Sequence, residues 1–74
     1  MSDIVYVIKK QIGVIETYPT GWRKELNLIS WNDSTPKYDL RDWAPDHHHM
    51  SRGVTLTSDE AKCLYEILKK EFEG

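Results

Sequence analysis

Apolar and polar residues alternate with a period of two along residues 22–31 and again along residues 37–43. Successive side chains of a β-strand point to opposite faces of the sheet, so this alternation predicts two strands. Residues 32–36, with the sequence NDSTP, have the composition of a loop between them. The even positions carry the apolar residues that we assign to the core, namely Leu26, Leu28, Tyr38 and Leu40.

Two further strands are predicted on either side of this pair. A β-rich run covers residues 3–18, with a polar and glycine-containing interruption at residues 9–13. This interruption predicts a bulge or a bend near the middle of the strand. Residues 52–56, with the sequence RGVTL, predict a short fourth strand after an irregular segment that contains Pro45.

The last segment is predicted to be an amphipathic helix. Thr57 and Glu60 have the spacing of a capping box, which makes Thr57 the expected N-cap and Ser58 the alternative. Apolar residues then recur at helical spacing as one stripe, formed by Ala61, Leu64, Tyr65, Leu68 and Phe72 and widened by Cys63 and Ile67. The expected fold is α+β, a curved four-stranded antiparallel sheet followed by one C-terminal helix.

The chain has 74 residues, and we expect a single domain over residues 1–74. A chain of this size buries only about 60% of its unfolded surface, so a second copy often completes the core. The broad apolar surface of the helix favours a homodimer with Leu64, Ile67 and Leu68 in the interface. One cysteine, no run of about 18 apolar residues and an acidic N-terminus predict a cytoplasmic protein without membrane contact.

The odd positions of the two central strands carry cations and tryptophans, and we expect this face to be exposed to solvent. Cations follow the phosphates of a single-stranded nucleic acid, and aromatic rings stack on its unpaired bases. The alternative is that the tryptophans are core residues, and Trp22 has the core parity. The candidate nucleic-acid-binding residues are Arg23, Lys24, Asn27, Trp31, Lys37, Arg41, Trp43 and Arg52.

The formal net charge of −2 does not oppose this interpretation, because the acidic excess lies in the predicted helix. Binding depends on a local patch more than on the total charge. Glu25 and Asp39 share the proposed face, and we expect them to pair with Arg23 and Arg41. Such pairs are either purely structural, or they orient the guanidinium groups towards phosphate.

No other residues form a recognisable chemical site. Three adjacent histidines, His47, His48 and His49, are unlike the spaced ligands of structural zinc sites, so we expect them to be solvated. Cys63 lies in the apolar region of the helix and is expected to pack there. No phosphate-binding loop, HExxH sequence or nucleophile motif occurs. We therefore expect neither enzymatic activity nor a bound cofactor or metal.

Three segments together resemble a known family: GWRKELNLISWND, PKYDLRDWAPDHHHM and SRGVTLTSDEAKCLYEIL. They are similar to the transcriptional coactivator positive cofactor four family, in its bacterial YdbC-like branch. The most specific part resembles the family's hydrophobic-Asp-Ile-Arg strand, its Asp-Pro and Met-bearing loop and its Gly-Ile-Ser-Leu strand. These correspond here to residues 38–41, 45–50 and 53–56.

The resemblance implies a homodimer of ββββα protomers whose curved sheets bind single-stranded DNA, and it implies association with the nucleoid in a bacterium. By position, Trp31 resembles the family's stacking aromatic residue, and Lys37 resembles the basic residue that opens strand three. Arg41 is similar to the arginine of the Asp-Ile-Arg strand. Trp43 falls in the aromatic cluster after it, and Arg52 resembles the basic residue before the glycine of strand four.

We therefore expect a non-enzymatic protein that binds single-stranded DNA with little sequence preference and acts in transcription, replication or repair. RNA is the second candidate ligand. The alternative is a protein-interaction dimer that docks a partner on the Trp and Arg side chains, since these residue types are also interface hot spots. Salt separates the two, because a phosphate-driven complex weakens steeply as salt rises.

Overall fold

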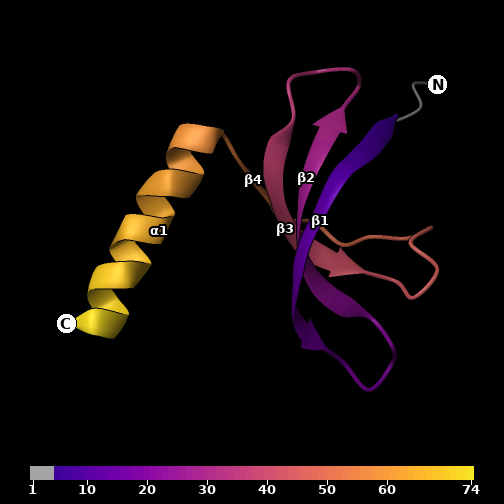
Figure 1. Cartoon of the computed structure of the whole chain (residues 1–74). Helices are drawn as coiled ribbons and strands as arrows, with labels where there is room; N and C mark the ends of the chain where they lie inside the picture. The colour runs from indigo at the N-terminus through magenta and orange to yellow at the C-terminus, as the bar shows by residue number, and fades with distance from the viewer. Residues whose placement is uncertain (1–4) are drawn as a thin grey trace.

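The computed structural model of the protein describes residues 5–74, which form one antiparallel sheet followed by a helix (Figure 1). The strands pair in chain order. Their bounds are β1 (Tyr6–Thr17), β2 (Arg23–Trp31), β3 (Lys37–Trp43) and β4 (Val54–Leu56), and the helix is α1 (Ser58–Glu73). The predicted order of elements is confirmed. The fourth strand begins at Val54 instead of residue 52, and the expected first strand's start at residues 3 and 4 lies outside the described residues.

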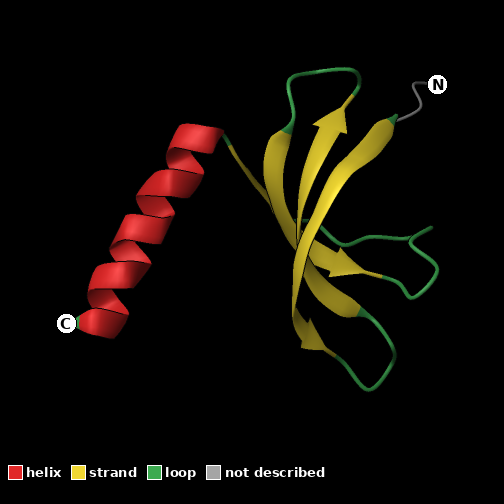
Figure 2. Ribbon diagram, viewed as in Figure 1, coloured by secondary structure: helices red, strands yellow, loops and turns green. Residues whose placement is uncertain are grey.

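The long strand β1 is bent where its sequence is interrupted. The register of its pairing with β2 shifts between Ile8 and Lys10, and it shifts twice more further along the strand. A bulge leaves an extra residue unpaired and increases the local twist. The sheet is accordingly coiled, as the curved ribbons of Figure 2 show. The predicted irregularity near the middle of the strand is confirmed.

The strand register sorts the side chains of the sheet into two faces. Paired residues of antiparallel strands lie on the same face. We call one face the leucine face; its apolar residues are Leu26, Leu28, Tyr38, Leu40, Val54 and Leu56. We call the other the tryptophan face; in β2 and β3 it consists of Arg23, Glu25, Asn27, Ile29, Trp31, Lys37, Asp39, Arg41 and Trp43. The predicted division of the two strands into faces is confirmed.

The core of the described chain lies on the tryptophan face, contrary to the sequence-based prediction. The buried apolar residues are Ile29 and Trp43, each 0% exposed, and Ala44. The four residues that we assigned to the core are only half-buried. The prediction of solvent exposure is wrong for Trp43 and for Asn27, which is 1% exposed.

The curvature of the sheet explains this reversal. Tyr6 pairs with Trp31 near one end of β2, whereas Trp43 pairs with Arg23 at the other end. The rings of Tyr6 and Trp43 are nevertheless only 5.5 Å apart, so the tryptophan face is concave. His47, from the segment after β3, covers this concave side, with its ring 5.4 Å from that of Trp43. Alternation assigns residues to faces, but it does not determine which face lies inside the curve.

The helix α1 begins as its sequence predicts but buries none of its residues. The hydroxyl of Thr57 accepts a hydrogen bond from the backbone of Glu60, and the Glu60 carboxylate accepts one from the backbone of Thr57. The predicted capping box is therefore confirmed. Phe72 is 83% exposed, and Ile67 is 59% exposed. Within residues 5–74 no helix has the length and hydropathy that a membrane span requires.

Trp43→Ala should unfold the protein or destabilise it strongly. Replacing a buried Trp by Ala costs roughly 3–5 kcal/mol, which is a large share of the stability of a small domain. Trp31→Ala is the matched comparison, because Trp31 is only half-buried. Urea unfolding followed by circular dichroism, at one protein concentration, measures both variants. Equal stability of the two variants would contradict the location of the core.

Candidate nucleic-acid interface

An arginine–carboxylate pair lies on the tryptophan face in β3. Arg41 donates to Asp39 through two hydrogen bonds, of 2.6 Å from Nε and 2.7 Å from Nη2. The two residues are two positions apart on one strand, which places their side chains on the same face. Asp39 is completely buried, and only 13% of the Arg41 side chain is exposed. The predicted Asp39–Arg41 pair is confirmed, and it neutralises a carboxylate that would be costly to bury alone.

A second buried carboxylate, Glu25, lies on the same face in β2. It is 3% exposed and forms an ion pair of 2.8 Å with Arg23, as the sequence predicts. Asn27 donates to Glu25 at 3.2 Å, and the Nε2 atom of His47 lies 3.0 Å from the Glu25 Oε2 atom. Burial by itself raises the pKa of Glu25. The hydrogen bonds from Asn27 and His47 and the charges of His47 and Arg23 outweigh burial, so the pKa is lowered overall.

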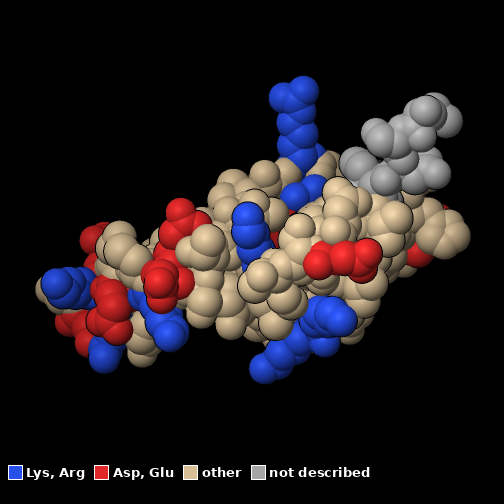
Figure 3. Space-filling view, turned by 90° about the horizontal axis from the view of Figure 1, so that it is seen from above, with Lys and Arg blue, Asp and Glu red and all other residues tan. Residues whose placement is uncertain are grey.

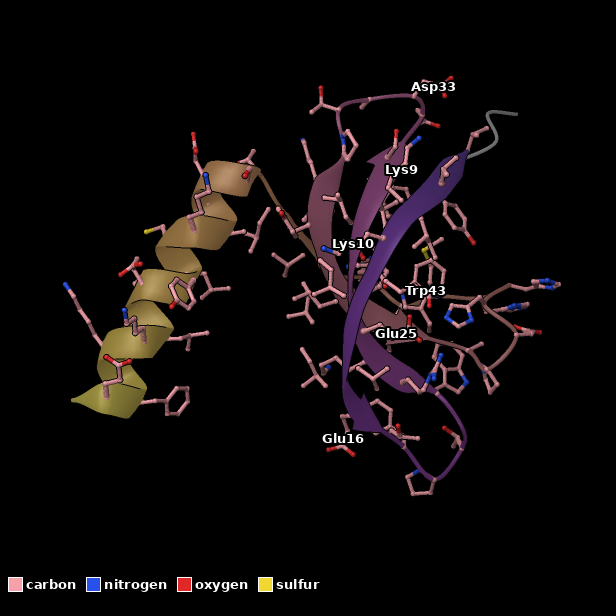
Figure 4. All side chains as sticks on the ribbon, viewed as in Figure 1. Lys9, Lys10, Glu16, Glu25, Asp33 and Trp43 are labelled. Carbon is pink, nitrogen blue, oxygen red and sulfur yellow. The ribbon has the colours of Figure 1, made fainter. Side chains whose placement is uncertain are left out.

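The expectation that all three histidines are solvated is wrong for His47. Its backbone has a left-handed conformation with φ of 59°, and its ring is half-buried between Glu25 and Trp43. In Figure 4, Glu25 and Trp43 lie on the side of the sheet away from α1. His48 and His49 are exposed. Among the described residues, no group of three or more His, Cys, Asp or Glu side chains is arranged to hold a metal ion.

Trp31 lines a hollow at the end of β2. The hollow is bordered by Lys37, Arg41 and Thr55 and by three polar residues of the β2–β3 loop, Asn32, Ser34 and Thr35. The ring centroid of Trp31 is 4.7 Å from the Cζ atom of Arg41 and 5.5 Å from the ring of Tyr6. The site therefore combines an aromatic ring, a lysine and several hydroxyl groups, which suits the stacking and hydrogen bonding of an unpaired base.

The other candidate nucleic-acid-binding cations are spread over different parts of the structure. Lys24 is on the other face, where it forms an ion pair of 3.2 Å with Asp42. Arg52 is exposed in the segment before β4, and Lys37 is exposed at the start of β3. Figure 3 shows basic side chains projecting at separate points over the sheet, whereas both charges intermingle on the helix. The structure thus brings six of the eight candidates onto one face, but it buries Asn27 and Trp43 within it.

Sequence inspection missed three residues of this region: Tyr6, His47 and Thr55. Tyr6 belongs to the bulged strand, in which alternation cannot be followed from one end to the other. His47 reaches the face through a turn that includes its own left-handed backbone. Thr55 pairs with Asp39, and the predicted strand at residues 52–56 contained this signal. Pairing β4 with β3 in register would have placed Thr55 beside the candidates.

Glu25→Gln should lower stability near neutral pH, and this loss should shrink in acid. Because the folded state lowers the pKa of Glu25, its ionised form contributes stability above the ordinary value of 4.5. That contribution disappears as the pH falls through the lowered pKa. Unfolding free energies from urea titrations at a series of pH values measure the difference from the native sequence. Glu16→Gln, at an exposed site in β1, is the control. A difference that is the same at every pH would exclude this role of ionised Glu25.

Comparison with known proteins confirms the family that the sequence motifs resemble, without testing the branch within it. The model of the family described as Transcriptional Coactivator p15 (PC4) matches residues 18–67, from just before β2 into α1. An uncharacterized protein of Treponema pallidum (strain Nichols) is 42% identical over 67 residues, which are 90% of this chain and 79% of that protein. The family is a non-enzymatic nucleic-acid-binding domain whose function is linked to transcription. From its sequence and its four-strand and helix architecture, the chain belongs to the Transcriptional Coactivator p15 (PC4) family.

Proposed function

We propose that the protein binds single-stranded DNA, with little preference for sequence, along the rim of the tryptophan face. The observation that carries this proposal is the hollow beside Trp31, where an aromatic ring, Lys37 and loop hydroxyl groups meet. Exposed Arg52 and the partly exposed Arg23 extend the positive charge along the path that we propose for the sugar-phosphate backbone of the DNA. Stacking on an aromatic ring is tolerant of base identity, which supports weak sequence preference.

The buried candidates have a supporting function in this proposal. Asn27 donates to Glu25, and Trp43 packs against Tyr6 and His47. Neither reaches the surface, so we do not propose base stacking on Trp43. Lys24 lies at the end of the other face and contributes general attraction to a polyanion. We propose a function in transcription, with replication and repair as further processes that use single strands, and with RNA as the second candidate ligand.

We propose that the functional unit is a homodimer assembled through α1. Leu64 and Leu68 are 42% and 43% exposed, and both lie on the apolar stripe of a helix that buries none of its residues. The partly exposed leucine face lies on the same side of the sheet as α1, the side towards which Lys10 points in Figure 4. A second copy would remove both apolar surfaces from water, which is the main driving force for protein association.

Lys37→Gln and Arg52→Gln should each weaken binding to oligo-dT, oligo-dC and a mixed strand by similar factors. Each should also lower the slope of log affinity against log salt by about 0.7, the value for one phosphate contact on a single strand. Fluorescence anisotropy of labelled oligonucleotides at several salt concentrations measures both quantities. Lys62→Gln, on the polar side of α1, is the matched control. Duplex DNA and RNA of the same length test the choice of ligand.

Two results would count against this function. Absence of binding to any single strand rejects it directly. Binding that does not change with salt rejects phosphate contacts and favours the docking of a protein partner on the same side chains.

Leu68→Asp should convert the dimer into monomers or unfold it, because an unpaired charge in an apolar interface is poorly tolerated. Lys62→Asp places the same charge on the polar side of α1 and should leave the dimer intact. Sedimentation velocity at micromolar concentration measures the mass of both variants and of the native protein. A native protein that sediments as a monomer would reject the dimer.

A further inference from the structure

Each of the three nitrogen atoms of the Arg41 guanidinium group contacts an acceptor within the protein. Nε and Nη2 donate to the two oxygens of Asp39. Nη1 lies 3.4 Å from both the sulfur atom of Met50 and the backbone oxygen of Ser51. An arginine that binds phosphate through its planar edge needs two free parallel N–H groups. The edge formed by Nε and Nη2 is already occupied by a buried carboxylate.

The surroundings of Arg41 also leave its side chain little room to move. A Cβ atom at Gly53 would lie 2.5 Å from the Cβ atom of Arg41 and 2.9 Å from its Nε atom. The segment before β4 is therefore packed directly against Arg41. Releasing the guanidinium to solvent would also leave Asp39 buried without a cation, and breaking such a pair is strongly destabilising. Arg41 is thus held in place at both ends of its side chain.

The ring of Trp31, in contrast, is held only by packing. Its Nε1 atom is buried and has no hydrogen-bond acceptor among the described residues. Its described aromatic and cationic neighbours are Tyr6 and Arg41, and the Arg41 Cζ atom is 4.7 Å from the ring centroid. A guanidinium stacks on an indole face through dispersion and cation–π attraction. The orientation of the ring therefore depends on the position of Arg41.

We propose that Arg41 is a positioning residue, which holds the Trp31 ring against the hollow and does not itself bind phosphate. Asp39 fixes the guanidinium, and the guanidinium fixes the indole. This inference rests on the proposed binding of single strands at that hollow. In this inference the exposed Lys37 binds phosphate and Arg41 supports the Trp31 ring on which a base stacks, although both are cations bordering the same hollow.

Arg41→Gln should weaken binding to oligo-dT roughly five- to a hundredfold, the range for a lost stacking platform, but it should leave the salt slope unchanged. Lys37→Gln is the contrast, because it should lower that slope by about 0.7. Arg41→Lys retains the charge opposite Asp39 but not the planar group, and it should bind almost as poorly as Arg41→Gln. In the Trp31→Ala background, Arg41→Gln should cause little further loss.

A measurement on the native protein decides the question even if these variants fail to fold. The side-chain Nε–H resonance of Arg41 should be protected from solvent exchange in the free protein, and it should remain so when oligo-dT is added. The indole N–H resonance of Trp31 should shift during the same titration.

Three outcomes would overturn the inference. The first is a salt slope that Arg41→Gln lowers. The second is a double variant whose loss of affinity equals the product of the losses from Arg41→Gln and Trp31→Ala. The third is an Arg41 Nε–H resonance that shifts or loses its protection from solvent exchange when oligo-dT is added. If the native protein binds no single strand, the proposed function fails first and the inference fails with it.

Discussion

Two buried carboxylates determine how the tryptophan face is built. An ionised carboxylate without a partner is costly to bury, so Asp39 and Glu25 each require a cation on the same face. Arg41 and Arg23 supply these cations from positions two residues away on the same strands. Glu25 also contacts His47, and this contact helps to hold the segment after β3 over the concave side. Both arginines therefore have a partner within the folded protein before any ligand is considered, although Arg23 remains partly exposed whereas Arg41 is largely buried.

Much of the fold could be predicted from local sequence. Alternation located the two central strands and sorted their side chains into the correct faces, because a strand has a fixed period of two. The capping box located the start of α1, since its two hydrogen bonds connect residues only three positions apart. The direction of curvature could not be predicted. It depends on where β1 bulges against β2 and on the segment after β3, whose His47 contacts Trp43 and Glu25 on the concave side.

For the candidate site too, the sequence predicted the local contacts but not the contacts between distant segments. The Asp39–Arg41 and Arg23–Glu25 pairs follow from spacing alone, because residues two apart on a strand are neighbours on one face. The burial of Trp43 and the engagement of His47 do not, because they arise from contacts between segments distant in the chain. An arginine and a lysine bordering one hollow look equivalent in the sequence. Their exposure and their hydrogen bonds distinguish them in the structure.

The passage from β4 to α1 contains only Thr57, which is itself the helix N-cap. No longer linker separates the helix from the strand, so any change in the direction of α1 must be taken up by the backbone of Thr57 or by β4 itself. That strand pairs with β3 through only Val54, Thr55 and Leu56, and the residue before it is packed on Arg41. Only Thr57 lies between the helix and the strand whose Thr55 borders the hollow beside Trp31. A contact that fixes the direction of α1 therefore leaves the backbone of one residue between that fixed point and the edge of the hollow.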